Sequence, residues 1–136
     1  MLNTEGVSDA SLETVSKEVA SAKTDAENAV ADLYQSQKDA REANLDWYNT
    51  ILEQNQAIGE DLESERTILE NDGKVVTHEL AEDIAGNRRS QIQAQQAVLN
   101  ENNRLYENTG EVQYLQNMVA ARNAIEDIKS LGTTAD

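Results

Sequence analysis

The residues with the clearest chemical potential surround a glycine near the middle of the chain. Glu70 and Asp72 precede Gly73, and Glu79 follows it, so three carboxylates flank one turn. Carboxylate oxygens are the ligands that calcium prefers, and calcium requires about six to eight oxygen ligands. The position that would begin such a loop is Ile68, which carries no side-chain oxygen. Calcium binding by this segment is therefore retained only as an alternative.

Aligned on that glycine, the twelve residues Ile68–Glu79 resemble an EF-hand calcium loop that lacks its first ligand. His78 is the single histidine and the chain has no cysteine, which excludes the usual zinc sites. No serine is spaced with a base to form a catalytic triad. Carboxylates such as Asp61 and Glu65 are four residues apart on a helix face, where they repel each other. We therefore expect no enzymatic activity, no metal and no cofactor.

The elements that would position these residues are helices, because the chain contains no proline in 136 residues. Proline removes a backbone donor and breaks helices, so its absence permits very long ones. The one strong turn signal is Asn71-Asp72-Gly73, since glycine readily adopts positive φ and ends helices. We predict an all-α fold, a long antiparallel helical hairpin or coiled-coil-like bundle. Its first arm covers about 8–71, its turn 71–74 and its second arm about 75–131.

Weaker signals divide the second arm and the ends of the chain. Softer breaks are expected near Gly86 and Gly110, where glycine lies beside polar turn residues. Residues 1–7 and 132–136 are expected to be flexible ends. Residues 1–136 as a whole are expected to form a single helical domain. Disorder of the whole chain is the alternative, and the regular spacing of the apolar residues argues against it.

An apolar seam follows each arm at helical spacing. In the first arm it passes through Leu12, Val15, Val19, Ala22, Ala26, Ala29, Leu33, Ser36, Ala40, Ala43 and Trp47, then continues one position later through Tyr48, Ile51, Ile58 and Leu62. In the second arm it passes through Val75, Val76, Leu80, Ile84, Ile92, Gln95, Leu99, Asn102 and Tyr106. The shift of one position is what a nearly straight helix requires, because about 3.6 residues per turn drift from strict heptads. Small residues dominate the middle of the first seam, so stability there must accumulate over length.

The seam residues predict how the arms pair and what they leave uncovered. Folding the chain back about residues 72–73 would place Trp47 against Val98 or Leu99, and we expect Trp47 to be a packing anchor. Two helices cover only one side of each other, so part of the apolar surface is expected to mediate oligomerisation or docking. The residues expected to make packing or oligomer contacts are Leu33, Trp47, Tyr48, Ile51, Ile58, Leu62, Leu115, Val119, Ile125 and Ile128.

The chain is strongly acidic, with a net charge of −15. Nine carboxylates lie between Glu60 and Asp83, against only Arg66 and Lys74. Such a charge repels phosphate backbones and anionic membrane surfaces, and the pair Arg88-Arg89 is too short for a nucleic-acid patch. We therefore expect no sequence-specific binding of nucleic acid. The acidic turn is expected to be a solvated tip, or alternatively a docking site for a basic partner.

The start of the chain and its hydropathy bear on localisation. Residues 1–6 lack the basic and apolar regions of a signal peptide. No stretch approaches the roughly 18 apolar residues of a membrane span. We expect a soluble chain with no signal peptide and no transmembrane segment.

Two segments carry a resemblance to a known family. Gln56–Glu60, and Asn87–Gln96 about thirty residues later, resemble the core of the small internal virion proteins of T7-like short-tailed phages, within a similar Ala-, Gln- and Asn-rich helical background. The resemblance implies a virion protein that is ejected from the capsid and helps to assemble a conduit for DNA across the host envelope. It implies partners among copies of itself and other virion proteins. The apolar terminal segments of a membrane-inserting member are absent, so the resemblance does not extend to direct insertion.

The leading functional prediction is a non-enzymatic helical structural or assembly protein, a phage virion component that acts by oligomerisation. The alternative is a cytoplasmic or secreted coiled-coil adaptor, or a filament-type protein, whose acidic tip binds a basic partner. A third hypothesis is a calcium-responsive helix–loop–helix. The first two hypotheses differ in their salt dependence, because contacts between exposed charges weaken as salt rises and apolar contacts do not. The third predicts that added calcium changes the thermal stability.

Overall fold

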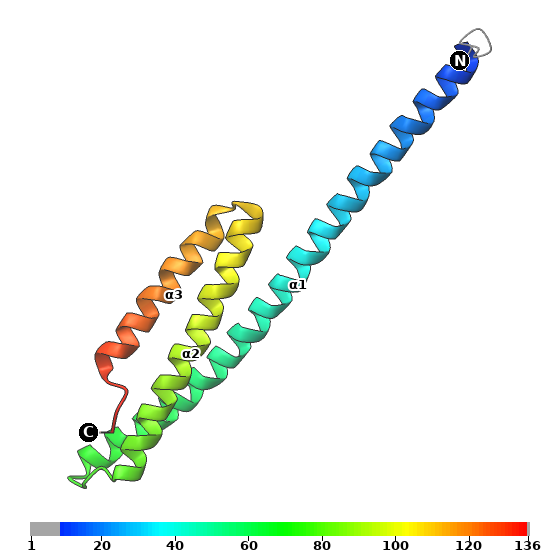
Figure 1. The fold of residues 1–136 in the computed structure, drawn as a ribbon. Coiled ribbons are helices and arrows are strands. Elements are labelled where there is room, and N and C mark those ends of the chain that lie inside the picture. The colour runs from blue at the N-terminus through cyan, green and yellow to red at the C-terminus, as the bar shows by residue number, and fades with distance from the viewer. Residues whose placement is uncertain (1–8, 136) are drawn as a thin grey trace. The chain divides into compact units, whose positions relative to one another are not determined.

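A computed structural model describes residues 9–135, which are helical almost throughout (Figure 1). Three helices follow one another in this part of the chain: α1 at Asp9–Asn71, α2 at His78–Thr109 and α3 at Val112–Leu131. No residue within these limits belongs to a strand. The predicted all-α class is therefore confirmed.

The contacts between residues divide the chain into two units, with the boundary between Asp39 and Ala40. The first unit holds the N-terminal part of α1, in which every residue from 10 to 37 is exposed. The second unit holds the rest of α1 together with α2 and α3. The single helical domain expected from the sequence stays a prediction, and the flexible N-terminal end expected at residues 1–7 lies outside the described residues.

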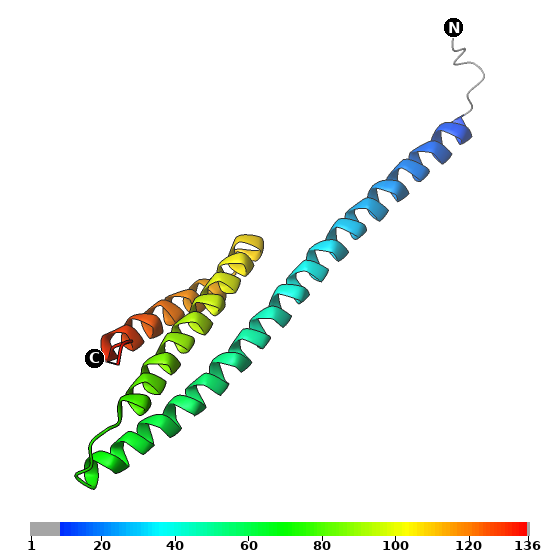
Figure 2. The ribbon, with the colours of Figure 1, turned by 60° about the horizontal axis from the view of Figure 1, so that its bottom comes forward.

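The turn between α1 and α2 is seen at one end of the ribbon in Figure 2. Backbone hydrogen bonds around Gly73 build it. The amide of Lys74 donates to the carbonyl of Leu69 at 2.9 Å, and that of Gly73 donates to Glu70 at 3.1 Å. Gly73 has a φ of 71°, a conformation that side chains with a Cβ rarely adopt. This is a Schellman motif, and it ends the long helix where the Asn-Asp-Gly signal predicted.

Helix α2 begins three residues later than the sequence predicted, because Thr77 caps it. The Oγ1 atom of Thr77 accepts a hydrogen bond from the amide of Leu80 at 3.1 Å. A threonine at this position satisfies an amide that the helix itself leaves without a partner. Residues 74–77 are therefore a non-helical connection rather than the start of the second arm.

Replacing the capping threonine tests this boundary. Thr77→Ala should lower the free energy of unfolding by about 1 kcal/mol, because the Leu80 amide loses its acceptor. The matched control is Thr67→Ala inside α1, where Oγ1 of Thr67 bonds to the carbonyl of Glu63 on an exposed face. That control should be neutral or slightly stabilising, since alanine is the better helix former. Equal destabilisation of the two variants in urea unfolding would contradict the assigned cap.

The predicted break near Gly86 is wrong, because α2 continues through that residue. An isolated glycine costs a helix about 1 kcal/mol, which buried neighbours can outweigh. Ile84 and Ala85 are buried at 5% and 2% exposure. Asn87, which looked like part of a turn, instead donates from its side chain to the carbonyl of Asn55 in α1.

The predicted break near Gly110 is confirmed, and it ends α2 completely instead of only bending the second arm. Gly110 has a φ of 69°, and its amide donates to the carbonyl of Tyr106 at 2.7 Å, which closes α2. The chain then reverses, and α3 lies beside α2 in both views (Figures 1 and 2). The second arm is therefore two packed helices and not one helix reaching about residue 131.

The core of the second unit is small and mixes aliphatic and alanine side chains. One cluster joins Leu52 of α1, Ala94 and Val98 of α2, and Ala121 of α3, with Leu45, Tyr48, Ile51 and Leu99 packed against it. Alanine at these contacts lets helices approach closely while burying little area per residue. The three helical segments of this unit thus share one narrow core.

Candidate functional site

Helices α1 and α2 approach each other closely at Gly59. A Cβ atom built on Gly59 would lie 2.5 Å from Oδ1 of Asn87 and 2.7 Å from Nε2 of Gln91. Such distances are shorter than a carbon atom tolerates without some movement, so the present side-chain positions require glycine here. The sequence predicted only that the helix passes through Gly59, and the structure supplies the reason for the residue.

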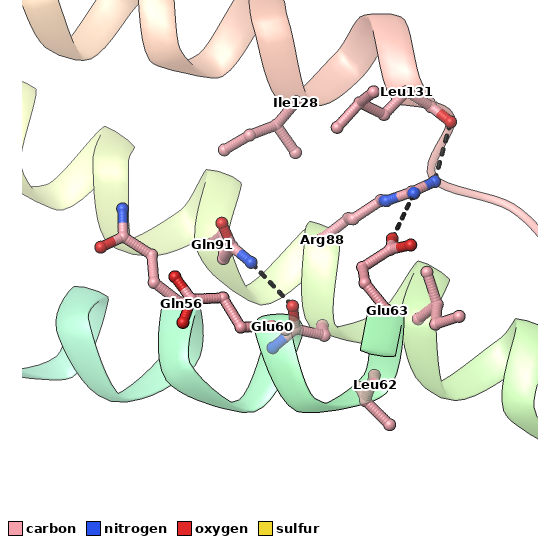
Figure 3. Close-up of a pocket in the computed structure, with 11 residues that line it drawn as sticks. Gln56, Glu60, Leu62, Glu63, Arg88, Gln91, Ile128 and Leu131 are labelled. Carbon is pink, nitrogen blue, oxygen red and sulfur yellow. Dashed lines mark hydrogen bonds and ion pairs between the residues drawn. The ribbon is translucent and has the colours of Figure 1, made fainter. Parts of the chain in front are cut away.

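Asn87 uses its amide group to join the two helices at this point. Its Nδ2 atom donates to the backbone carbonyl of Asn55 at 2.8 Å, and its Oδ1 atom accepts from Nε2 of Gln91 at 2.7 Å. The Asn87–Gln91 bond is drawn in Figure 3. Both groups are partly buried, where a hydrogen bond lost to substitution leaves a desolvated polar atom. Gly59, Asn87 and Gln91 therefore form one polar junction between α1 and α2.

Arg88 extends the connection from α1 and α2 to the end of α3. Its Nη2 atom donates to Oε1 of Glu63 at 2.6 Å. Its Nη1 atom donates to the carbonyl of Leu131 at 2.8 Å, as drawn in Figure 3, and to that of Gly132 at 3.1 Å. The adjacent Arg89 donates to the carbonyl of Thr133 at 2.6 Å. The paired arginines thus satisfy carbonyls at the C-terminal end of α3, in the segment that was expected to be flexible.

A partly open groove of about 500 Å³ lies over this junction (Figure 3). It is lined by Gln56, Gly59, Glu60, Leu62, Glu63, Ile84, Asn87, Arg88, Gln91, Ile128 and Leu131. The segments Gln56–Glu60 and Asn87–Gln96, which lie on α1 and α2, therefore border the same groove.

Amide, carboxylate, guanidinium and aliphatic side chains line the groove. None of the residues lining it is serine, threonine, cysteine or histidine. Arg88 and Glu63 are already paired with each other. Within residues 9–135 no group of three or more histidine or acidic side chains is arranged to hold a metal ion. The arrangement is suited to holding helices together.

A buried ionic group lies elsewhere in the second unit. The side chain of Glu101 is 1% exposed, while those of Arg41 and Arg104 are 33% and 57% exposed. Arg104 donates from Nη1 to Oε2 of Glu101 at 3.2 Å. Nη1 of Arg41 lies 3.8 Å from Oε1, an ion pair without a hydrogen bond. A buried carboxylate needs such partners, because removing it from water is costly.

Amide and hydroxyl groups continue this polar layer towards α3. Asn102 is 1% exposed, and its Nδ2 atom donates to the carbonyl of Val98 at 2.9 Å. Its Oδ1 atom accepts from Nδ2 of Asn117 at 3.1 Å. The hydroxyl of Tyr114 donates to Oε1 of Glu42 at 3.0 Å. Directional bonds of this kind fix which faces of the helices meet, beyond what a narrow apolar core specifies.

The residues predicted to make packing or oligomer contacts fall into two groups. Ile125 is buried at 6% exposure, Tyr48 and Ile51 pack against the core cluster, and Leu62 and Ile128 line the groove. The remaining five are exposed large apolar side chains: Leu33, Trp47, Ile58, Leu115 and Val119.

The prediction that Trp47 packs against Val98 or Leu99 is wrong, because its side chain is 63% exposed. Tyr48 packs against the cluster that contains Val98. Successive residues lie about 100° apart around a helix, so one position decides which side chain faces the partner. The face that α1 presents to α2 therefore includes the seam residue Tyr48 but not its neighbour Trp47.

The same displacement explains what the sequence reasoning missed in α2. The expected seam passed through Leu99 and Tyr106, whereas the structure buries Val98 and Leu105, the latter at 0% exposure. The buried positions Ile84, Val98 and Leu105 are separated by multiples of seven residues. This spacing in the sequence could have identified the buried face of α2. The burial of Glu101 had no comparable signal, since a charged residue is rarely assigned to a core.

No protein-family model, no curated protein and no solved structure matches this chain. Within residues 9–135 no helix is both long and apolar enough to cross a membrane.

Proposed function

We propose that the protein is a non-enzymatic structural component that acts by helix-mediated assembly. The observation that carries this proposal is the exposed apolar seam in the N-terminal part of α1. Leu12, Val15, Val19 and Leu33 are 55%, 54%, 64% and 59% exposed and recur at helical spacing. Apolar side chains aligned on one face of a helix are the signature of a surface that packs against another helix.

The energetics of an isolated helix support a partner for this surface. In proteins, most helical stability comes from packing an amphipathic face and not from intrinsic propensity. Between residues 10 and 37 of the first unit, every residue of that face is exposed. Burial of apolar area contributes about 25 cal/mol per Å², so covering the seam would supply the packing energy that this helical segment lacks.

A second exposed apolar row lies on α3. Val112, Leu115 and Val119 are 60%, 40% and 54% exposed and are separated by three and four residues. This spacing places them on one side of the helix. Each unit of the chain thus presents an apolar helix face, as expected of a component that contacts more than one neighbour.

The likeness of Gln56–Glu60 and Asn87–Gln96 to the internal virion proteins of short-tailed phages supports a place among phage virion components, as an internal or DNA-ejection conduit protein. Those proteins work by assembling. Because both segments border the same groove, a single packing role accounts for both of them. We therefore propose that assembly occurs with copies of this chain or with other virion proteins.

The proposal predicts multimers that depend on the apolar seam. The protein should sediment as concentration-dependent multimers whose mass persists at roughly 1 M salt, where the Debye length falls to about 3 Å. The double variant Val19→Glu/Leu33→Glu should sediment as a monomer, because it places charges in the seam. Analytical ultracentrifugation at matched concentrations provides the measurement.

The matched control moves the same charges two positions along the helix. Ser21→Glu/Gln35→Glu adds identical charge on the exposed outer side of α1 and should leave the multimers intact. A wild-type protein that stays monomeric at all concentrations would contradict the proposal. Equal loss of multimers in both double variants would show that net charge, and not the seam, controls assembly.

The acidic turn favours one second candidate, an adaptor that binds a basic partner. Ile68 and Val75 are 61% and 86% exposed within the segment Glu60–Asp83, which carries nine carboxylates. Exposed apolar side chains among like charges suit a basic amphipathic helix. This candidate predicts binding to a lysine-rich amphipathic peptide that weakens steeply as salt rises, whereas seam-mediated assembly does not.

A further inference from the structure

The apolar seam of the first unit keeps a strict seven-residue repeat. Its members alternate in steps of three and four residues and are all exposed: Leu12, Val15, Val19, Ala22, Ala26, Ala29, Leu33 and Ser36. A repeat of seven makes helices supercoil around one another with their seams in contact. Over this segment the pattern is therefore that of a coiled coil.

The two borders of the seam differ in charge. The residues that directly precede Val19, Ala26, Leu33 and Ala40 are all acidic: Glu18, Asp25, Asp32 and Asp39. The residues that directly follow Val15, Ala22, Ala29 and Ser36 are Ser16, Lys23, Val30 and Gln37, of which none is acidic. Every one of these eight border residues is exposed. One edge of the seam is thus uniformly negative, and the other is neutral with one positive charge.

We propose that the first unit pairs with a second copy of this chain, parallel and in register, through the seam from Leu12 to Ser36. The inference rests on the proposed assembly function and names the partner and its orientation. In a parallel coiled coil, the residue directly before Val19, Ala26 or Leu33 in one helix contacts the residue five places later in the other helix. Glu18 of one copy then meets Lys23 of the other.

The remaining parallel contacts join acidic residues to uncharged ones. Asp25 meets Val30, and Asp32 meets Gln37, so the parallel arrangement contains no like-charge pair between these borders. Lys23 is available for the pairing, because its only ion pair in the described chain is with Glu27 at 4.0 Å, and both side chains are largely exposed.

The antiparallel arrangement is disfavoured by the same residues. When helices run in opposite directions, the two acidic borders face each other. Matching Leu12 with Ser36 and Val19 with Ala29 places Glu18 against Asp32 in each half of the pair, and Asp25 against Asp25 of the other copy at its centre. Facing like charges suppress an alternative pairing, which is how flanking residues select orientation in coiled coils.

Layers of small residues also suit the parallel register. Ala22, Ala26 and Ala29 would each lie against the same residue of the second copy, so the helices approach evenly along this stretch. Larger residues, among them Val19 and Leu33, flank the alanine layers on both sides. Each of these would also contact the same residue of the second copy. Alanine contacts bury little area, so the pair gains stability by its length.

The absence of native cysteine allows a direct test, because single cysteines can be introduced without competing thiols. A disulfide forms only when the two Cα atoms lie within about 7 Å. Ser36→Cys occupies a seam position and should convert to a disulfide-linked dimer under mild oxidation. The control Ser21→Cys makes the same replacement on the outer side of the helix and should remain a thiol.

A mixture of Val19→Cys and Ala29→Cys chains, distinguished by mass tags, separates the orientations, because these positions face each other when the seam from Leu12 to Ser36 pairs antiparallel. Parallel pairing yields only dimers of like chains, whereas heterodimers linking position 19 to position 29 would establish antiparallel pairing and overturn the inference. Multimers by sedimentation without the Ser36→Cys crosslink would also overturn it, while leaving the proposed assembly function in place. A protein that stays monomeric under all conditions would contradict both the parallel pairing and the proposed assembly function.

Discussion

Replacing Arg41 and Arg104 together by methionine should lower the free energy of unfolding by about 3–5 kcal/mol. The double variant leaves the carboxylate of Glu101, at 1% exposure, without either cation. A buried charge that loses its partners keeps its full desolvation penalty. The main cost of the double variant is therefore the unpaired carboxylate and not the loss of the two arginine side chains, which are partly exposed. Urea unfolding followed by circular dichroism, at one fixed protein concentration, provides the measurement.

Removing the carboxylate as well should restore most of the lost stability. In the triple variant Arg41→Met/Glu101→Met/Arg104→Met, three flexible apolar side chains replace the ionic group. Buried ionic groups replaced by apolar ones of similar volume are often neutral or stabilising. Oε1 of Glu101 and Nε of Arg41, both buried, have no hydrogen-bond partner within residues 9–135, so the native group is incompletely satisfied. A triple variant as unstable as the double would show that the ionic contacts are themselves stabilising.

Gly59→Leu should lower the free energy of unfolding by about 2–3 kcal/mol, since overpacking alone costs about 1–3 kcal/mol. The new side chain would occupy the space that Asn87 and Gln91 now fill at 2.5 and 2.7 Å from the Cβ position. Those amides must move, which breaks the bond from Asn87 to the carbonyl of Asn55 at a cost of about 1 kcal/mol. The greater helix propensity of leucine recovers up to about 1 kcal/mol. The same unfolding measurement applies.

Gly86 supplies the control for helix propensity. A Cβ atom there would lie 3.5 Å from Nη2 of Arg89, an ordinary contact. Gly86→Ala should therefore stabilise the protein by about 0.5–1 kcal/mol through propensity alone. Gly59→Ala, measured beside it, should not share this gain. If both alanine variants were equally stabilised, the close approach at Gly59 would be ruled out as the reason for that residue.

The fold class follows from local features that act without a partner. The absence of proline and the helical spacing of apolar residues predict long helices, and Gly73 and Gly110 end two of them. Positive φ at these glycines is a property of one residue and its neighbours, which is why both ends were predictable. Gly86 shows the limit of that logic, because its local cost is outweighed by packing that only the folded chain provides.

The polar junction was only half visible in the sequence. In the sequence, Gln56–Glu60 and Asn87–Gln96 are two separate polar segments with no visible link between them. Their meeting at Gly59 depends on the register in which α2 folds back on α1, and Asn55 and Asn87 are thirty-two residues apart in sequence. No periodicity of single helices encodes such a contact, because polar residues at a helix surface usually face water.

The helical content, the position of the main turn, the apolar seam of the first unit and the charges beside that seam could all be predicted from the sequence. Each of these depends on residues that lie close together along the chain. The packed structure was needed to show that Tyr48 and not Trp47 meets the core, that α3 folds back on α2, and that Glu101 is buried. These features depend on side-chain volume and direction between helices, where a rotation of about 100° per residue exchanges a core position for a solvent position. Local preference cannot resolve that choice, because only packing of the assembled helices distinguishes one face from its neighbour.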